Sequence, residues 1–493
     1  MLDKPSALMD LRPCYEGYAG IPQEARLLFA MFAGMGLPRL GGLASGMHFV
    51  SRRGRRAGSA FERTLAQTGA LIAQDGGGHY TPFGLGGRLP AGLGRLLSRA
   101  YLVAAYGGRA ERLDVEIDPV VFEDYLWTRL FERTLPPSAR GLLGRARFFA
   151  TEIGHENARH LCFLPRVLQR RVASSGWDVF FACTVSPYRV APGTATLVRY
   201  YDALPLLSPH TVGDPGPHSF SHARLLGRNM ADGAHFVCDS EPVRGDLLRM
   251  FPEAEARVRT IPCLLAPEFR PDVRPEAEVL GVLARRATAV HDLPAVLPRL
   301  VMAVSTLEPR KNWLRLFRAF EAARGRGAPI HLLVVANPGW RSEAEQAALR
   351  GLVAAGAAFH LAGVSVAELR VLYSAAHLVV APSRAEGFDY SGVEAMACGT
   401  PVVASDTAVH RWVYGDAAVF VDPYDDDALA DVLTGLGGLA AGEGRLGLLR
   451  EAGLRQAAIY SAAALVPRWE QAVTEVSGRR SLAAGVPASL PMG

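Results

Sequence analysis

Hydrophobic and polar positions alternate along the second half of the chain in the pattern of an α/β domain. Short apolar runs predict buried parallel strands, and the stretches between them repeat apolar residues at helical spacing. Trp313, Leu316, Phe317 and Phe320 fall at i, i+3, i+4 and i+7, which predicts a helix stripe that faces a core. The expected strands are 300–305, 331–336, 358–363, 377–383 and 401–405, and the expected helices are 313–323, 342–353, 366–376 and 391–397.

The first half shows a looser form of the same pattern. Leu8–Arg12 predicts a strand, a glycine-containing loop follows, and residues 21–32 predict a helix whose Pro22 suits the first turn. Between residues 41 and 161 the pattern weakens into Gly/Arg-rich loops and helical pieces, where no site is predicted. The basic run 51–58 is interpreted as a solvated loop, with anionic lipid or polymer contact as the alternative. Further strands are expected at 179–185, 195–203, 235–240 and 257–262.

These patterns predict two doubly wound, Rossmann-like α/β domains that face each other across a cleft. A stretch rich in Pro and Arg, PEFRPDVRPEAE, separates the two halves, and the predicted boundary follows it. The expected domains are 1–285, with the weakly patterned region 41–161 inside it, and 286–465. Residues 466–493 are expected to form a C-terminal helix and tail that pack back on the first domain.

The composition is that of an ordinary globular protein. A formal charge of +5 over 493 residues, without a concentrated basic face, argues against a nucleic-acid partner. The six cysteines are widely spaced and form no CxxC pair, which favours a reducing compartment. The first residues lack a signal-peptide pattern, and no apolar run is long enough to span a bilayer, so a cytoplasmic location is expected. Only two lysines occur, Lys4 and Lys311.

The segment EGFDYSGVE, residues 386–394, places acidic groups around a predicted helix start. Gly387, Phe388 and Asp389 lie where free backbone N–H groups and the helix dipole favour an anion. Glu394 lies about 12 Å beyond Glu386 if the segment is wholly helical, which suits a ligand with phosphates in the middle and a sugar at each end. The alternative is capping by an acid plus a surface glutamate.

A second segment, STLEPRKN, adds positive charge at the same sheet edge. It follows the first strand of the second domain and carries Arg310 and Lys311. Two cations beside an anion-binding helix start can neutralise a departing diphosphate. The alternative is a solvated loop.

Other polar groups are not predicted to bind metal. Asp425, Asp426 and Asp427 open a helical segment, which is typical of helix capping. Four scattered histidines lack metal spacing and are interpreted as packed or surface residues: His155, His160, His210 and His410.

Together EGFDYSGVE, EAMACGTPVVAS and STLEPRKN resemble the E-x7-E signature and its companions in the GT-B, family 4 (group 1) retaining glycosyltransferases. The match covers about residues 301–423. DLRPCYEGYAGIPQEARLLF, VRYYDALPLLSPHTV and FVCDSEPVRGDLL are similar to members that act in bacterial surface-polysaccharide assembly, mannosyltransferases among them.

The resemblance implies a role for each matching residue. Arg310 and Lys311 would hold the donor diphosphate, Glu386 and the backbone of 387–389 the transferred sugar, and Glu394 the ribose. Gly20 and Ile21 would bring backbone N–H groups to the phosphates from the first domain. Tyr201 stands beside Asp202 where the family often has histidine, so a histidine contact to the sugar is in doubt while a tyrosine hydroxyl can still donate.

The implied activity is retaining transfer of a hexose from a nucleotide-diphospho-sugar to a growing or lipid-linked glycan in cell-surface polysaccharide synthesis. No cofactor is required; GDP-mannose is the favoured donor and a UDP-sugar the alternative. The lipid-linked acceptor would bring the enzyme to the inner face of the plasma membrane. Two alternatives stay open: a GT-B nucleotide-sugar epimerase, and a non-catalytic nucleotide-sugar or polysaccharide binder. A nicotinamide dehydrogenase is disfavoured because no GxGxxG stands between a strand and a helix.

Overall fold

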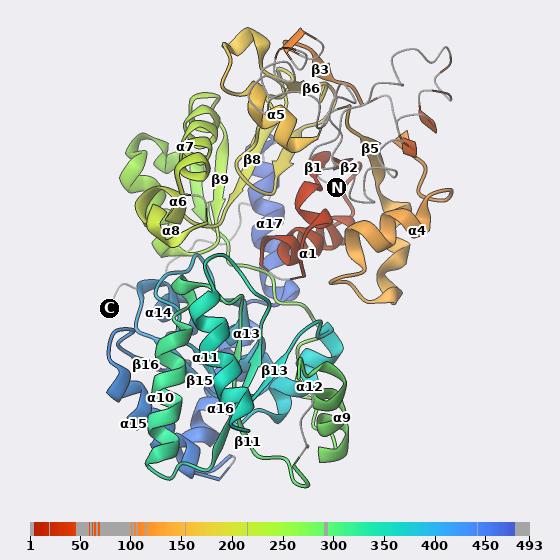
Figure 1. Ribbon diagram of the computed structural model, residues 1–493. Helices are drawn as coiled ribbons and strands as arrows, with labels where there is room; N and C mark the ends of the chain where they lie inside the picture. The colour runs from red at the N-terminus through yellow and green to blue at the C-terminus, as the bar shows by residue number, and fades with distance from the viewer. Residues whose placement is uncertain are drawn as a thin grey trace, which may run out of the picture. The chain divides into compact units, whose positions relative to one another are not determined.

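A computed structural model of the protein describes residues 4–478, except 19, 46–58, most of 60–106, 114–115, 153, 214, 290–293 and 441. The basic run 51–58, much of region 41–161 and residues 479–493 of the predicted tail lie outside the described residues. The chain forms two compact units (Figure 1). The first comprises Met1–Tyr200, Ala223–Val237 and Val466–Gly493, and the second Tyr201–His222 and Cys238–Leu465. This division differs from a single boundary at 285/286, because the chain crosses between the units several times.

The first unit is built on a mostly parallel sheet whose strands lie in the order β9-β8-β7-β1-β2-β5-β4. Its central strand β1 pairs in parallel with β2 and β7, while the edge strand β4 runs antiparallel to β5. The strands of this sheet are β1 Ala7–Asp10, β2 Leu40–Ala44, β4 Glu116–Ile117, β5 Arg147–Ala150, β7 Val179–Ala182, β8 Ala195–Tyr200 and β9 His235–Cys238. A short pair, β3 Ala110–Glu111 and β6 Arg171–Val172, lies apart from it.

Strand β2 falls inside the region that showed no clear pattern. Its sequence, LGGLA, reads as a loop because glycine weakens a strand. Both glycines are nonetheless required by packing: a Cβ on Gly41 would lie 2.7 Å from the Trp177 ring, and one on Gly42 would lie 2.3 Å from Leu11 Cδ1. The need for glycine in this strand therefore depends on the side chains of Trp177 and Leu11, which come from other parts of the chain.

Helices of the first unit include one contributed by the end of the chain. The Trp469 ring of α17 is buried and meets Phe32 at 5.9 Å and Phe181 at 5.5 Å between ring centroids. None of the described helices is long and apolar enough to cross a bilayer. The helices are α1 Ile21–Gly34, α4 Glu123–Leu126, α5 His155–Leu161, α7 Pro215–Ala231, which belongs to this unit from Ala223 onward, and α17 Ala462–Val476, which belongs to it from Val466 onward.

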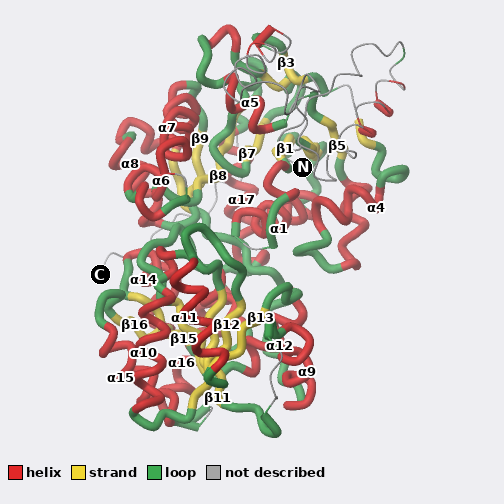
Figure 2. Tube along the Cα trace, in the orientation of Figure 1, coloured by secondary structure: helices red, strands yellow, loops and turns green. Residues whose placement is uncertain are grey.

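The second unit contains a six-stranded sheet, in the order β13-β12-β11-β14-β15-β16, with every pairing parallel. Figure 2 shows these strands flanked by helices. The sequence predicted five of the six strands near their observed positions and missed β16. Their bounds are β11 Arg299–Val304, β12 Ile330–Val335, β13 Ala358–Leu361, β14 Leu378–Ala381, β15 Val402–Ser405 and β16 Ala418–Val421.

Helices connect successive strands of this sheet. The predicted stripe of α10 is confirmed: Trp313, Leu316, Phe317 and Phe320 are each at most 2% exposed and join one apolar core. Strand order runs outward from β11 in both directions, so right-handed connections place helices on both faces. The helices of this unit are α6 Leu204–Leu207, α8 Glu241–Met250, α9 Glu276–Arg286, α10 Trp313–Gly325, α11 Glu343–Ala354, α12 Val366–Ala375, α13 Tyr390–Ala397, α14 Ala408–Tyr414, α15 Asp426–Gly438 and α16 Gly444–Ala458. The unit also contains the short strand β10, Val258–Thr260.

Candidate functional site

The carboxyl ends of β11 and β14 form the candidate site. Strand β12, which follows β11 in the chain, lies on one side of β11, and β14 lies on its other side. The direction in which successive strands are added therefore reverses between β11 and β14. Such a reversal leaves a crevice at the carboxyl edge of an open parallel sheet, where ligands of α/β proteins bind. A small pocket of about 20 Å³ lies here, and the residues that line it include Ser305, Lys311, Ser383, Glu386, Asp389 and Ser391.

Two cations meet one carboxylate in this crevice. Lys311 Nζ donates to Glu386 Oε1 at 2.6 Å, and Arg310 Nη1 donates to Glu386 Oε2 at 2.8 Å. The Glu386 side chain is only 8% exposed, and both cationic side chains are less than 20% exposed. The structure therefore joins the two segments that the sequence predicted to share one edge of the sheet.

The charge state of Glu386 follows from its partners. Burial opposes its ionisation, but the positive charges of Arg310 and Lys311 outweigh burial and lower its pKa. Burial likewise opposes the charge on Arg310, whose pKa is nevertheless raised by Glu386. Glu386 is consequently a carboxylate at neutral pH, which can accept hydrogen bonds but cannot act as a proton donor.

Backbone contacts hold the two loops together. Arg310 and Lys311 lie in a 3-10 turn, Pro309–Lys311, and Asn312 then adopts a left-handed conformation, with φ of 61°, before α10 begins. The Arg384 backbone N–H donates to the Arg310 carbonyl at 3.0 Å, and the Arg384 guanidinium donates to the Pro309 carbonyl at 2.7 Å. The charged cluster is thus positioned by main-chain geometry.

Gly387 is required by a close approach of main chain to main chain. A Cβ at this position would lie 1.7 Å from the Tyr201 carbonyl oxygen. The Gly387 carbonyl accepts a hydrogen bond from Ser240 Oγ at 2.8 Å. The glycine next to Glu386 therefore fixes the loop against residues that lie far away in the sequence.

Asp389 caps α13 and pairs with a histidine. Its side chain accepts from the Ser391 backbone N–H at 3.1 Å and lies 3.3 Å from His410 Nε2. Burial favours neutral forms of both groups, but their mutual attraction lowers the pKa of Asp389 and raises the pKa of His410. The sequence predicted the helix start correctly and treated His410 only as a packed or surface residue, because nothing local marks its distant partner.

The His410–Asp389 pair predicts a pH dependence of stability. Because the pKa of His410 is raised above its usual 6.5, the contribution of the pair is complete below that value and lost as pH rises through the raised pKa. We expect the difference in unfolding free energy between wild type and His410→Gln to shrink as pH rises from about 6 to about 9. Urea titrations across that range measure it.

His331→Gln is a matched control for this experiment. Burial lowers the pKa of His331, so its effect on stability should show the opposite pH trend. A difference between wild type and His410→Gln that does not change with pH would contradict the ion pair.

The remaining residues of the acidic motif are buried. Glu394, 5% exposed, accepts a hydrogen bond from the Tyr373 hydroxyl at 3.2 Å. The Phe388 ring packs 5.4 Å from the rings of Tyr390 and Tyr460. The alternative of a surface glutamate is therefore wrong for Glu394, while capping of the helix by an acid is confirmed, with Asp389 as the cap.

Asp202 is electrostatically coupled to the charged cluster. Burial raises its pKa, and the charge of Arg310 partly offsets this. Its neighbour Tyr201 supplies the carbonyl that faces Gly387. Gly20 and Ile21 belong to the first unit, where Gly20, with φ of 69°, precedes α1 after the carboxyl end of β1. A phosphate-binding role for Gly20 and Ile21 stays a prediction.

The three aspartates at 425–427 cap a helix or form ion pairs with arginines. Asp425 caps α15 by accepting from the Ala428 backbone N–H at 2.9 Å, as expected. Asp426 pairs with Arg315 at 2.6 Å, and Asp427 pairs with Arg326, which follows the last residue of α10. Across the described residues, no three His, Cys, Asp or Glu side chains form a metal-binding group.

A comparison with protein families identifies the domain that carries this site. Residues 298–437 match the family described as glycosyl transferases group 1. These residues form a group 1 glycosyltransferase domain. The glycosyltransferase domain contains the charged cluster, the cap of α13 and Glu394.

Similar proteins of known name agree with this assignment. The chain is 29% identical to O-antigen chain mannosyltransferase B of Escherichia coli, covering 44% of this chain and 56% of that protein. It is 30% identical to the D-inositol 3-phosphate glycosyltransferase of Salinispora tropica, covering 52% of each. The chain thus spans little more than half the length of these two relatives.

Solved structures show the fold of the whole chain. A sucrose-phosphate synthase from Thermosynechococcus elongatus superposes with a TM-score of 0.57 at 16% identity, covering 96% of this chain and 99% of that one. A glycosyltransferase from Rickettsia africae gives a TM-score of 0.51 at 12% identity, with the same coverage. The glycosyltransferase domain is therefore part of a chain with the GT-B fold, as the sequence indicated.

Proposed function

We propose that the protein is a retaining glycosyltransferase that moves a hexose from a nucleotide-diphospho-sugar to a growing or lipid-linked glycan in cell-surface polysaccharide synthesis. The observation that carries this proposal is the contact of Arg310 and Lys311 with Glu386 at the carboxyl edge of the group 1 domain. That cluster offers positive charge for a diphosphate and a carboxylate for sugar hydroxyls within one buried crevice.

In this proposal Arg310 and Lys311 hold the donor diphosphate. The bond from the anomeric carbon to the diphosphate breaks on the face where the acceptor oxygen bonds, and a leaving phosphate oxygen takes the acceptor proton. Charge grows on the diphosphate as this bond breaks, so fixed cations in a buried site stabilise the transition state more than the ground state. Because both cations already contact Glu386, the diphosphate shares them with that carboxylate.

The other residues of the motif position the donor. Glu386 accepts hydrogen bonds from hydroxyl groups of the transferred sugar, and the backbone N–H groups of 387–389 donate to its oxygens. Glu394 accepts hydrogen bonds from the ribose hydroxyl groups. Tyr201 and Asp202 lie on the sugar side, and Gly20 and Ile21 contribute backbone N–H groups to the phosphates. The chemistry rests on positioning and charge stabilisation.

GDP-mannose is the donor that we favour, with a UDP-sugar as the alternative. The relatives include five mannosyltransferases, two of them named for the O-antigen chain. A lipid-linked acceptor would place the enzyme at the inner face of the plasma membrane as a peripheral protein in the cytoplasm.

Thermal unfolding in the presence of GDP-, UDP-, dTDP- and ADP-sugars tests donor binding. One base should raise the melting temperature, because a ligand that binds only the folded state stabilises it, by about 2.7 kcal/mol at a hundred times its dissociation constant. The rise should be absent in Lys311→Ala. A rise that survives in Lys311→Ala, or no rise with any donor, counts against the assigned site.

A transfer assay then separates this proposal from its alternatives. Incubation of the stabilising donor with glycan acceptors should form a product whose anomeric configuration, measured by NMR, matches that of the donor. Conversion of the donor without any acceptor would indicate an epimerase instead. Binding without consumption in the presence of acceptors would indicate a binding protein.

A further inference from the structure

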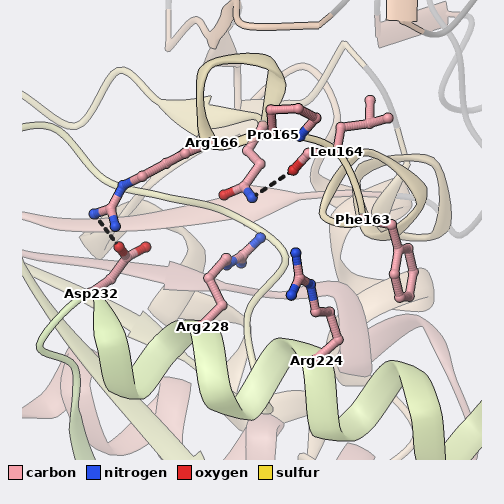
Figure 3. Close-up of a pocket in the computed structure, with 8 residues that line it drawn as sticks. Phe163, Leu164, Pro165, Arg166, Arg224, Arg228 and Asp232 are labelled. Atoms are coloured by element: carbon pink, nitrogen blue, oxygen red, sulfur yellow. Dashed lines mark hydrogen bonds and ion pairs between the residues drawn. The ribbon is translucent and has the colours of Figure 1, made fainter.

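A second polar cavity lies in the first unit, and none of the residues to which the donor is assigned lines it. It has a volume of about 410 Å³ and is bounded by α7 and by the segment 163–169 that follows α5. Figure 3 shows Arg224 and Arg228 rising side by side from α7 toward this segment. The volume is within the range of small-molecule sites.

The lining of this cavity is strongly basic. Its lining contains three arginines, Arg166, Arg224 and Arg228, and one carboxylate, Asp232. Asp232 is already paired with Arg166, and its second oxygen lies 3.4 Å from Nε of another arginine, Arg189. Within the described part of the chain, Arg224 and Arg228 form no ion pair, so two positive charges at this cavity are left without a counter-ion.

Two of the lining side chains also bury polar atoms that lack partners. Arg228 Nη2 donates to the Ser186 carbonyl, but its Nε and Nη1 are buried and have no oxygen or nitrogen acceptor among the described residues. Burial raises the pKa of the nearby Cys162 thiol, and the charge of Arg228 together with a hydrogen bond between the two side chains partly offsets this. A thiol is a weak acceptor, so this contact is a poor substitute for an oxygen ligand.

Gln169 supplies the complementary group. It is 5% exposed and donates through Nε2 to the Leu164 carbonyl at 3.0 Å, while its Oε1 is buried without a partner in the described structure. A buried donor or acceptor without a partner destabilises the folded protein, so poorly paired donors and an unpaired acceptor lining one cavity indicate a missing ligand that has both kinds of group.

We propose that this cavity binds a phosphate ester that carries a neighbouring hydroxyl group. The guanidinium groups of Arg224 and Arg228 present forked N–H donors that match the oxygens of a phosphate. The Gln169 carbonyl oxygen accepts from the hydroxyl. A phosphoglycerol unit has this chemistry, either as free glycerol phosphate or as the headgroup of a phospholipid.

Glycerol 3-phosphate and the full-length protein test the cavity directly. The segment 163–169 should become protected from hydrogen–deuterium exchange when the compound is added. Because Arg224 is exposed and makes no ion pair in the described structure, Arg224→Glu should fold normally and weaken binding by at least about tenfold, as loss of a charge-assisted hydrogen bond does. Arg145→Glu, at an exposed arginine of the same unit outside the cavity, should bind like wild type.

Vesicles distinguish the two sources of the phosphate ester. Binding to phosphatidylglycerol vesicles but not to phosphatidylcholine vesicles, weakened by Arg224→Glu and competed by glycerol 3-phosphate, would support a lipid headgroup. Protection by free glycerol 3-phosphate alone would support a soluble ligand. The proposal is overturned if neither glycerol 3-phosphate nor phosphatidylglycerol vesicles protect 163–169. It is also overturned if Arg224→Glu and Arg145→Glu weaken binding equally, or if Lys311→Ala rather than Arg224→Glu abolishes binding.

Discussion

Replacing Lys311 with alanine is expected to lower the rate of sugar transfer by at least about a hundredfold, the effect of removing one charge-stabilising group. Lys311 contacts Glu386 at 2.6 Å in a buried cluster, where its ammonium would also meet the leaving diphosphate. Glu386 keeps its contact with Arg310 at 2.8 Å in the variant, so no buried carboxylate is left without a cation and the domain should still fold.

Lys4→Ala is the matched control, because Lys4 is the only other lysine in the chain. Its side chain is 43% exposed and pairs with Glu470 in the first unit. Steady-state transfer and circular dichroism, measured on both variants, distinguish loss of chemistry from loss of structure. Turnover in Lys311→Ala within a few fold of wild type would contradict the role assigned to this lysine.

Replacing Gly387 with alanine is expected to destabilise the protein by about 3 kcal/mol or more, the upper range for overpacking a filled site. The new Cβ would lie 1.7 Å from the Tyr201 carbonyl oxygen, and both atoms belong to or adjoin the main chain, so no side-chain rotation relieves the clash. The shift should also break the hydrogen bond from Ser240 to the Gly387 carbonyl and move Glu386. Transfer activity should fall together with stability.

Gly351→Ala provides the comparison for this substitution. Gly351 is an exposed residue inside α11, and a Cβ there meets nothing within 4 Å. Alanine should stabilise the protein by about 0.5–1 kcal/mol because glycine costs conformational entropy in a helix. Urea unfolding of both variants gives the two changes. An unfolding midpoint of Gly387→Ala equal to that of wild type would show that the loop does not need the close approach.

The sequence by itself determined most of the second unit. Its strands and helices are local patterns, since period and apolar content depend only on neighbours in the chain. The meeting of Lys311 with Glu386 could also be predicted, because loops that follow parallel strands emerge at one edge of the sheet. The core stripe of α10 and the cap at Asp425 follow from the same local rules.

The tertiary structure alone decided the contacts between segments that are far apart in the chain. The glycine-rich strand β2 is hidden in the sequence, because Trp177 and Leu11 make its glycines necessary. The ion pair of His410 with Asp389 and the basic cavity on α7 likewise depend on side chains brought together from separate elements. Such contacts leave no periodic mark, since each depends on the final positions of groups whose separation along the chain is arbitrary.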